Sequence, residues 1–381
     1  MTVTAALPDA PAGGVDAANP EPLVTCSAGF SDWLETQDIA LALTTYQAGR
    51  LFFVGRKPDG GIRAHERLIE NCQGLWTDGQ SLWTSSAFML WRFENVLQPG
   101  HAMPGGADRR FAPVEGRVTG QIDLHDIAMT QIDGAPRPIF VNTLCNCLAT
   151  ISDRDSFRPL WMPRFISALV AEDRCHLNGL AMDGTRPAYV TAVGTSDVAD
   201  GWRDQRQVGG VVIDVASGEI AAAGLSMPHS PRLYRGRLWL LNSGTGEFGQ
   251  IDLRDGSFTP LCFCPGFARG LAFSGNHAVI GLSLPRHGGS FSGLELDQRL
   301  ARKSATPRCG LLVVDLTSGR VEHWLRFGHT ITELYDTAVL PRTRMAEAIG
   351  FRNDDIRREI RPEIRSGTDR IMATPHPREG V

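Results

Sequence analysis

One short motif recurs along the chain, and it limits the possible folds more than any other feature. Gly-Leu, three variable residues and Gly stand at GLWTDG (74–79), GLAMDG (179–184) and GLAFSG (270–275). Less exact copies fill the gaps, at HDIAM (125–129), PRLYRG (231–236) and YDTAVLP (335–341). Each copy precedes or contains a stretch rich in Trp, Tyr, Val and Leu, which favours a β-strand. Spacings of roughly 40 to 60 residues are typical of β-propeller blades.

The repeats predict an all-β fold, a six-bladed β-propeller with four antiparallel strands in each blade. The units between repeats have the pattern strand, tight turn, strand, as in GGVVIDVASGEIAAAG (209–224), where Ser-Gly marks the turn. Blade one is predicted to be split, with its inner strand from 333–341 and its outer strands from 39–69, which leaves no open edge at the seam. A β-sandwich with a small helical domain is the alternative, but it does not explain the repeated motif. Blades two to six are predicted to begin near residues 71, 123, 176, 228 and 267.

We expect three segments in the chain. Residues 1–27 are rich in Ala, Pro and Gly and are predicted to be disordered, 28–345 form a single propeller domain, and 346–381 form a helical and then disordered tail, with a helix over RMAEAIGFRNDDIRREI (344–360). The N-terminal residues lack the basic and apolar regions of a secretory signal, and no apolar run is long enough for a bilayer. We therefore expect a cytoplasmic protein without membrane attachment.

Composition excludes two further classes. Lys and Arg number 38 against 42 Asp and Glu, for a net charge of −4. Broad nucleic-acid binding, which requires clustered positive charge, is therefore not expected. Eight cysteines in 381 residues are too few for a disulfide scaffold, and no C-x-x-C pair is present to suggest a cysteine metal site. We expect free thiols.

Polar residues gather where the predicted inner strands begin. These strands line the central channel of a propeller, so their first residues share one rim. Alignment on the repeat puts two sets at successive levels on the same side of the strands: Gln73, His125, Asn178, Ser230, Arg269 and Tyr335, and two residues earlier Asn71, Asp123, His176, Pro228, Phe267 and Glu333. His229 falls between the levels, but an irregular strand start between Pro228 and Pro231 would turn it inward.

Three of these residues are predicted metal ligands. His125, His176 and His229 come from different blades, and imidazole is the commonest metal ligand in proteins. A histidine-rich site favours Fe, Zn, Cu or Mn over Ca or Mg. The alternative is that channel histidines only satisfy backbone groups and water.

The remaining residues at this mouth have predicted roles around the ion. The predicted catalytic groups are Glu333, Asp336 and Tyr335. The carboxylate of Glu333 or Asp336 is predicted to orient a partner or accept a proton. Arg269 and Asn178 are predicted to bind substrate, Arg269 by holding an anionic group through paired hydrogen bonds. The alternative for Arg269 is a simple pairing with Glu333.

Two long loops should lie on the same rim. Residues 194–210 and 284–310 each connect the second strand of a blade to the third, and long structured insertions on one face are often functional. We expect them to form a lid, with Trp202, Arg203 and Arg286 as candidates to contact a substrate. The alternative is that these residues only close the channel mouth.

Several sequence blocks resemble a bacterial family of conserved hypothetical propeller proteins that is often encoded near tetratricopeptide-repeat proteins. The blocks are FVNTLCNCLATIS (140–152), DRCHLNGLAM (173–182), GLSMPHSPR (224–232), LWLLNSGTGE (238–247) and GFARGLAF (266–273). The resemblance covers about residues 28–345 and implies the propeller fold and a protein partner with helical repeats, but no reaction. A looser similarity, of architecture only, links the chain to six-bladed lactonases and strictosidine-synthase-like proteins. Their calcium sites use Glu, Asn and Asp, and the histidine-rich mouth departs from that pattern.

Together these observations predict a metal-assisted lyase, hydrolase, isomerase or oxygenase that acts on a small polar or anionic molecule at the channel mouth. The alternative is a non-catalytic ligand-binding or scaffold propeller. Neither the substrate nor the reaction type follows from the sequence.

Overall fold

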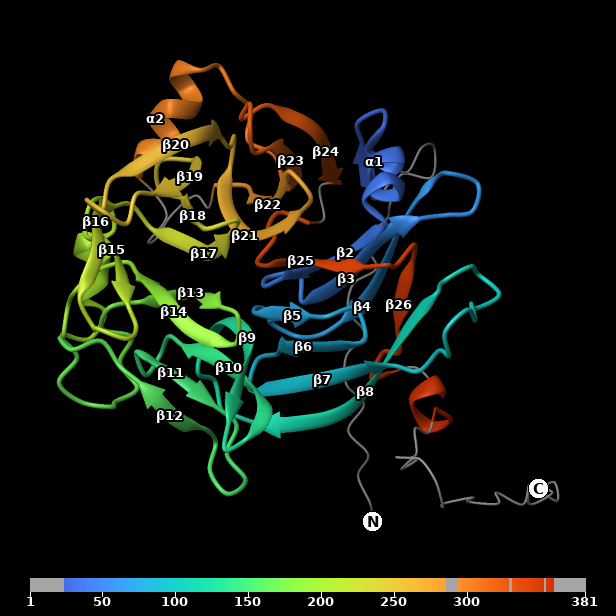
Figure 1. Cartoon of the computed structure of the whole chain (residues 1–381), viewed down its shortest axis with the longest axis horizontal. Coiled ribbons are helices and arrows are strands. Elements are labelled where there is room, and N and C mark those ends of the chain that lie inside the picture. Colours follow the sequence, from blue (N-terminus) through green and yellow to red (C-terminus); the bar gives the residue numbers. More distant parts are fainter. Residues whose placement is uncertain (1–23, 286–292, 329–330, 353, 360–381) are drawn as a thin grey trace, which may run out of the picture.

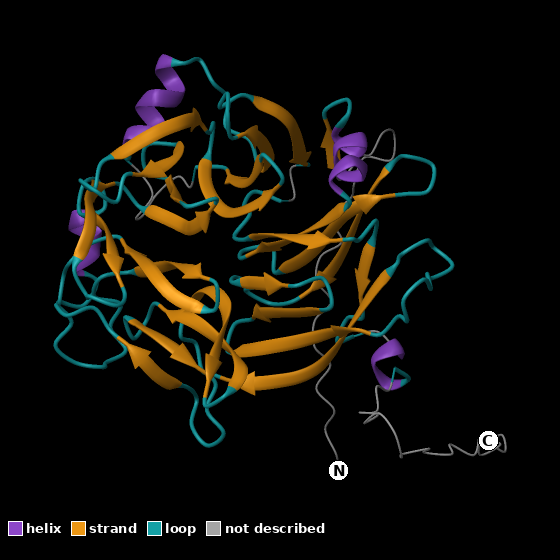
Figure 2. Cartoon of the chain, viewed as in Figure 1, coloured by secondary structure: helices purple, strands orange, loops and turns teal. Residues whose placement is uncertain are grey.

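The computed structural model describes residues 24–285, 293–328, 331–352 and 354–359. Within these residues the strands form six sheets arranged in a ring (Figure 1). The predicted six-bladed β-propeller is therefore confirmed. Strands dominate the chain, and the helical segments lie at the periphery (Figure 2). These segments are α1 (Phe30–Gln37), α2 (Glu295–Arg302) and the 3₁₀ turns Gly201–Gln205 and Asp354–Arg357.

Each blade runs outward from an inner strand at the channel through antiparallel neighbours. Blade one contains β25 (Thr337–Pro341), β2 (Ile39–Thr45), β3 (Arg50–Arg56) and β4 (Ile62–Leu68). Blade two contains β5 (Leu75–Thr77), β6 (Ser81–Ser85), β7 (Met89–Asn95) and β8 (Arg109–Val118). Blade three contains β9 (Leu124–Ile132), β10 (Ala135–Asn142), β11 (Cys147–Thr150) and β12 (Arg158–Trp161).

The second half of the ring repeats this order. Blade four contains β13 (Leu177–Asp183), β14 (Arg186–Ala192), β15 (Gly210–Asp214) and β16 (Ile220–Leu225). Blade five contains β17 (Pro228–Tyr234), β18 (Arg237–Asn242), β19 (Glu247–Ile251) and β20 (Phe258–Phe263). Blade six contains β21 (Phe267–Ser274), β22 (His277–Ser283), β23 (Gly310–Asp315) and β24 (Val321–Phe327).

The seam of the ring lies in blade one, as predicted. β25, from near the end of the chain, pairs antiparallel with β2, with Leu41 opposite Val339 and Ala40 opposite Leu340. The two halves of the sequence are therefore joined by backbone hydrogen bonds within one sheet. Closure of this kind removes the open edge that a split blade would otherwise expose.

Both ends of the described chain add a fifth strand to a blade, and here two predictions were wrong. β1 (Val24–Cys26) pairs with β24, so residues 24–26, which we predicted to be disordered, form a strand; residues 1–23 lie outside the described part. β26 (Ala346–Ala348) pairs in parallel with β8, near the start of the predicted helix over 344–360.

The sequence Ala346-Glu347-Ala348 explains the strand at the C-terminal end. Its two alanines are buried, whereas Glu347 between them forms ion pairs with Arg110 at 2.8 Å and with Arg63 at 3.6 Å. This alternation has the period of a strand, and the edge of β8 supplies backbone partners. The helical part of the tail within the described residues is the single 3₁₀ turn Asp354–Arg357.

The blades pack through alternate side chains of their strands. In blade one, Leu41 and Leu43 face a cluster that includes Val279 of blade six, whereas Ala40 and Ala42 face a cluster that includes Leu75 and Leu82 of blade two. Because neighbouring residues of a strand point to opposite faces, each blade contributes to two inter-blade cores.

The repeated glycines lie where neighbouring inner strands approach most closely. A Cβ atom on Gly179 would lie 2.3 Å from Pro231 Cδ, and one on Gly270, whose φ is 76°, would lie 2.6 Å from the backbone nitrogen of Thr337. Any side chain at these positions would push two blades apart. The motif that identified the propeller thus reflects crowding around its axis.

At the other blade junctions a side chain makes the contact. The carboxylate of Asp126 accepts a hydrogen bond from the backbone of Leu180 at 3.0 Å, and that of Asp336 accepts one from Leu75 at 3.0 Å. Both aspartates occupy the position that glycine holds in the exact repeats. They therefore link blade three to four and blade one to two.

Two smaller expectations can also be compared with the structure. All eight cysteines are free thiols, which confirms that prediction. Among the described helices, none has the length and apolar character needed to cross a membrane.

Candidate functional site

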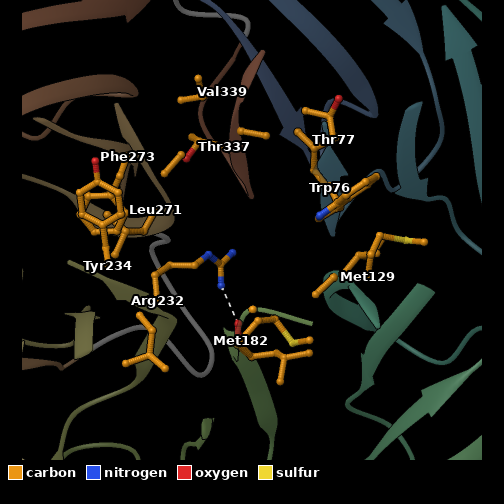
Figure 3. Close-up of a pocket in the computed structure, with 18 residues that line it drawn as sticks. Trp76, Thr77, Met129, Met182, Arg232, Tyr234, Leu271, Phe273, Thr337 and Val339 are labelled. Atoms are coloured by element: carbon orange, nitrogen blue, oxygen red, sulfur yellow. Dashed lines mark hydrogen bonds between the residues drawn. The ribbon is translucent and has the colours of Figure 1, made fainter. Parts of the chain in front are cut away.

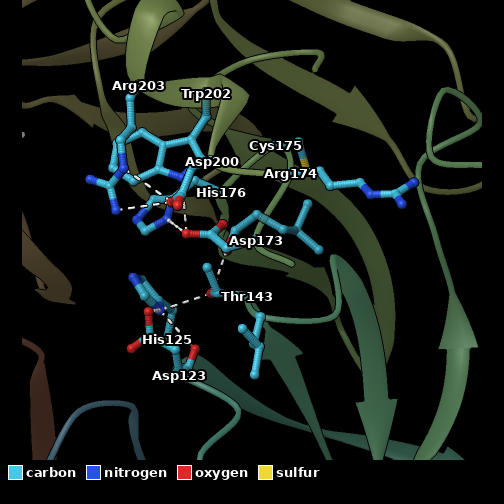
Figure 4. A network of polar contacts seen from close by, with 12 residues as sticks. Asp123, His125, Thr143, Asp173, Arg174, Cys175, His176, Asp200, Trp202 and Arg203 are labelled. Atoms are coloured by element: carbon cyan, nitrogen blue, oxygen red, sulfur yellow. Dashed lines mark hydrogen bonds and ion pairs between the residues drawn. The ribbon is translucent and has the colours of Figure 1, made fainter. Parts of the chain in front are cut away.

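The starts of the inner strands bring the predicted polar residues together. The imidazole rings of His125 and His176 have centroids 5.0 Å apart and lie nearly perpendicular (Figure 4). The ring of Tyr335 lies 5.4 Å from that of His125. All three side chains are buried. Blades one, three and four thus contribute to one cluster, which we call the histidine end of the channel.

The backbone at the histidine end has a repeated irregular conformation. Four non-glycine residues just before or at the start of inner strands have left-handed φ angles: Asn71 (49°), Asp123 (51°), His176 (51°) and Met227 (49°). Such a conformation costs about 1–2 kcal/mol for most residues, although Asn, Asp and His tolerate it better. Strain of this kind often accompanies functional sites, and here it recurs in blades two to five.

Each of the three predicted ligands uses its Nδ1 atom in a hydrogen bond. His125 Nδ1 lies 2.9 Å from the carbonyl oxygen of Asp123, and His229 Nδ1 lies 2.7 Å from that of Met227. His176 Nδ1 lies 2.8 Å from a carboxylate oxygen of Asp173.

These contacts fix the tautomer of each imidazole. Carbonyl and carboxylate oxygens can only accept, so Nδ1 carries the proton in all three rings. In the neutral form of each ring, Nε2 then has its lone pair available, as in histidines that bind metal ions.

The environment keeps two of these imidazoles neutral. Burial lowers the pKa of His125 to about 4, and the nearby positive charges of His176 and Arg269 add to the effect while Asp123 opposes it. Burial also lowers the pKa of His229 well below its ordinary value, with a further contribution from Arg269. A neutral imidazole is the form that binds a metal ion or accepts a proton.

His176 is held by a small network that the sequence reasoning missed. Asp173 Oδ2 accepts a hydrogen bond from Trp202 Nε1 at 2.9 Å as well as from His176. The Trp202 ring stacks on His176 with centroids 4.2 Å apart. Asp173 therefore positions His176, and the available signal was its place three residues earlier in DRCH. Trp202, a predicted substrate contact, is instead packed on the histidine.

Two of the three predicted catalytic groups, Tyr335 and Glu333, lie at the histidine end. Arg269 Nη1 is 3.8 Å from Glu333 Oε1, and the guanidinium lies over the rings of Tyr335 at 4.8 Å and Phe267 at 5.3 Å. The pairing of Arg269 with Glu333, given above as the alternative, is thus present. Burial also raises the pKa of Tyr335 well above its ordinary value, so its hydroxyl is protonated at neutral pH.

Several polar atoms at the histidine end have no hydrogen-bond partner within the described residues. They include His229 Nε2, Asn178 Nδ2, Asp173 Oδ1 and the Tyr335 hydroxyl. Buried polar groups are nearly always satisfied in folded proteins, so these atoms mark a place where water or a ligand completes the site.

Asp336 does not join this cluster. Its carboxylate accepts hydrogen bonds from the backbone of Leu75 and Thr337 and lies 3.9 Å from the guanidinium of Arg232. Asp336 follows Tyr335 by one residue, so its side chain leaves the strand in another direction. Burial, followed by the nearby charge of Asp126, raises the pKa of Asp336 to about 7. Its predicted place beside Glu333 as a catalytic carboxylate is therefore not supported by the geometry.

Arg232 and Asp126 complete a second polar layer across the channel. Arg232 donates to both carboxylate oxygens of Asp126, at 2.7 and 3.2 Å. We call Asp126, Arg232 and Asp336 the central layer. The sequence signal for it was the replacement of the repeat glycine by Asp in HDIAM and YDTAVLP.

The two long loops lie at the histidine end, as predicted. Trp202 of the first loop packs in one apolar cluster with Phe267 and with Leu296 and Leu300 of the second loop. The loops also touch each other, because Gln207 Nε2 donates to the backbone oxygen of Gly293 at 3.2 Å.

Two arginines of these loops, Arg203 and Arg286, were also predicted to contact a substrate. Arg203 is exposed, lies over the Trp202 ring and pairs with Asp200. Arg286, the other predicted substrate contact, lies outside the described residues.

The three histidines do not form a preassembled ligand set. Among the described residues, the group whose potential ligand atoms all lie within 4.8 Å of one another is His277, Asp315 and Glu322, at the side of blade six away from the histidine end. His277 Nε2 is 2.9 Å from Glu322 Oε2 there. A shared ion at the histidine end would therefore require the ligand atoms to move closer together than they are in this structure.

No curated protein matches the sequence. A chain in the crystal structure of a nidogen/laminin complex is 12% identical with a TM-score of 0.49, and the alignment covers 80% of this chain and 99% of that one. A protein of unknown function from Bacteroides caccae is 11% identical with a TM-score of 0.45, over 79% and 98% of the two chains.

A family profile gives the most direct relationship. The profile of DUF4915, a domain of unknown function, matches residues 28–349. This range spans all six inner strands and agrees with the resemblance drawn above over about residues 28–345. The chain therefore belongs to the DUF4915 family.

Proposed function

We propose that the histidine end binds a divalent transition metal ion through Nε2 of His125, His176 and His229. The observation that carries the proposal is the common use of Nδ1. In each ring this atom is occupied by a carbonyl or carboxylate oxygen, which is the arrangement that orients metal-bound histidines and sets their tautomer. Imidazole nitrogen ligands suit Fe, Zn, Cu or Mn.

We further propose that the ion acts on a small polar or anionic molecule. A bound divalent ion polarises an oxygen of the substrate or lowers the pKa of a bound water. Arg269 would hold the anionic group, and Asn178 and the protonated Tyr335 hydroxyl would donate hydrogen bonds to it. Glu333 is the carboxylate nearest to Arg269 in this arrangement and would accept a proton. A lyase, hydrolase, isomerase or oxygenase could each use these groups.

A binding module without catalysis is the second candidate, and one observation favours it. The ligand atoms of the three histidines are not all within 4.8 Å of one another, so the site is not preorganised for an ion. Neutral imidazoles, Asn178 and Tyr335 could instead hold a polar ligand by hydrogen bonds alone. A protein partner with helical repeats belongs to this second proposal.

Metal analysis of protein purified without a histidine tag tests the proposal. We expect near-stoichiometric Fe, Zn, Cu or Mn in the parent protein and loss of that metal in His176→Ala. His277→Ala is the matched control, because it removes a histidine from the other possible ligand set. It should leave the metal content unchanged.

Two results would decide against this assignment. If the purified parent protein contains no metal and takes none up on titration, the binding-module proposal is preferred. If His277→Ala loses metal and His176→Ala keeps it, the ion belongs to blade six and not to the channel.

A further inference from the structure

The opposite end of the channel contains a second cavity, below the central layer. Its volume is about 380 Å³, and all six inner strands line it (Figure 3). The side chains that form its walls are mostly apolar and half-buried; they include Trp76, Met129, Met182, Tyr234, Phe273 and Val339. We call this cavity the apolar pocket. None of the three channel histidines lines it.

The floor of the apolar pocket contains a positive charge that neighbouring carboxyl groups neutralise. Arg232, the charged residue in its lining, makes four hydrogen bonds within the described chain, two to Asp126 and one each to the backbone oxygens of Leu180 and Pro231. Asp336 lies on its other side at 3.9 Å. One cation therefore faces two carboxyl groups, and the floor has no positive charge left to attract an anion.

The walls offer large apolar surfaces. The rings of Tyr234 and Phe273 stack with centroids 4.4 Å apart and present one continuous aromatic wall, and Trp76 lies across the cavity (Figure 3). Thr337, which lines the pocket, has a hydroxyl without a hydrogen-bond partner among the described residues, but that oxygen is buried within the wall.

We propose that the apolar pocket is a binding site for a small uncharged molecule with an aromatic or other largely apolar ring system. The cavity volume falls in the range of about 300–1,000 Å³ that is usual for small-molecule sites. Apolar surface exposed at a concave mouth favours such a ligand. Burial of an anion next to Asp126 and Asp336 would be opposed both by desolvation and by like charge.

This proposal does not depend on the proposed metal site. The two sites share strands but no ligand-binding side chain, and the central layer separates them. A compound bound in the apolar pocket could therefore be present whether or not the histidine end holds an ion.

A pair of matched fluorescent probes tests the pocket. N-phenyl-1-naphthylamine is uncharged and carries one N–H group, and 8-anilinonaphthalene-1-sulfonate has the same ring system with an added sulfonate. We expect saturable binding of one uncharged probe per chain, and binding of the sulfonate at least about tenfold weaker because the floor disfavours a buried anion. Both titrations use the full chain and are followed by the rise in probe fluorescence.

Variants locate the bound probe. Met182→Trp and Met129→Trp fill the pocket from two different strands, and each should abolish binding of the uncharged probe. Met103→Trp, on the loop between β7 and β8, makes the same change outside the pocket and should leave binding intact. Thermal unfolding of each variant verifies that the fold is retained, and His176→Ala should bind the probe as the parent does.

Three results would overturn the proposal. They are no saturable binding of the uncharged probe, unchanged binding in both pocket-filling variants, or equal affinity for the two probes. None of these results bears on the metal content of the protein, so failure here can be distinguished from failure of the proposed function.

Discussion

The two ends of the channel are built from the same six strands but have opposite chemistry. At the histidine end stand His125, Arg269 and Tyr335; four residues later on the same strands, at the apolar pocket, stand Met129, Phe273 and Val339. Residues four apart on a strand point to the same side, so both sets face the channel. The comparison shows that the channel-facing side chains of these strands change from polar to apolar over four residues.

The central layer explains how both ends can coexist. Asp126, Arg232 and Asp336 cross the channel between them, and each aspartate also bonds to the inner strand of the next blade. The layer thus stabilises the junctions and isolates a polar chamber from an apolar one.

The largest effect is expected from loss of the strand that serves both ends. A chain that stops at residue 332 lacks β25, and with it Tyr335 of the histidine end and Val339 of the apolar pocket. Because β25 closes the ring against β2, we expect this chain to show no cooperative melting transition by circular dichroism. A chain that stops at residue 359 keeps every described strand and is the control. Cooperative melting of the shorter chain would contradict the closure.

The central layer is the next most sensitive part. Arg232→Met leaves the carboxylates of Asp126 and Asp336 without their cation, and loss of one partner of a buried ion pair costs about 3–5 kcal/mol. Arg158→Met removes an exposed pair with Asp133 and should cost less than about 1 kcal/mol. Urea unfolding measures both changes. Equal costs for the two variants would show that the layer contributes little.

The histidine end should respond to pH. His125 has a folded pKa of about 4, below the ordinary value of about 6.5, so the unfolded chain binds the proton more readily and stability falls as pH drops. Between pH 7 and pH 5 this contribution amounts to about 2 kcal/mol.

His125→Asn isolates that contribution. The asparagine amide can replace the Nδ1–H donor but cannot titrate, so the variant should lose about 2 kcal/mol less than the parent between pH 7 and pH 5. Asp336, whose raised pKa makes stability fall as pH rises from about 4 to 7, acts in the opposite direction in both proteins and cancels in the difference. Identical pH dependence by urea unfolding would mean that His125 is not held neutral.

The smallest effect is expected at the apolar pocket. Met182 borders an existing cavity, so Met182→Ala should lower the free energy of unfolding by only about 1 kcal/mol. Leu180, two residues earlier and almost fully buried, packs in a closed core, and Leu180→Ala should cost about 2–5 kcal/mol. If the two costs were similar, the walls of the pocket would be as tightly packed as the core.

The fold could be predicted from the sequence because the repeated glycines mark positions where neighbouring blades leave no space for a side chain. Gly179 and Gly270 are needed where blades crowd the axis, so the motif marks every second blade directly. The strand Ala346–Ala348 was missed because three residues that alternate apolar and charged are too few to override a helical composition. Its partner, the edge of β8, lies more than 200 residues earlier in the chain.

The sequence predicted which residues meet at the candidate site better than it predicted the contacts between them. Alignment on the repeat brought His125, His176, Arg269 and Tyr335 to one rim, since a regular strand fixes which side each residue faces. Asp336 was misplaced because two carboxylates three residues apart were treated as equivalent. Asp173 and Trp202 contact His176 from loops. A loop has no regular repeat in its sequence, so these contacts could not be predicted from a pattern.

The apolar pocket was also within reach of the sequence. The residues four positions after the aligned polar set are Thr77, Met129, Met182, Tyr234, Phe273 and Val339, and all of them line the pocket. The predictions used only the polar residues at the strand starts and did not extend to the residues four positions later.

Anomalous diffraction at the absorption edge of the metal found in the purified protein tests the central claim most directly. The account predicts one strong peak at the histidine end, with nitrogen atoms of His125, His176 and His229 at about 2.0–2.1 Å if the ion is zinc. The rings would have closed around the ion from their present separation. A peak between His277, Asp315 and Glu322 instead, or no peak within the channel, would contradict the account.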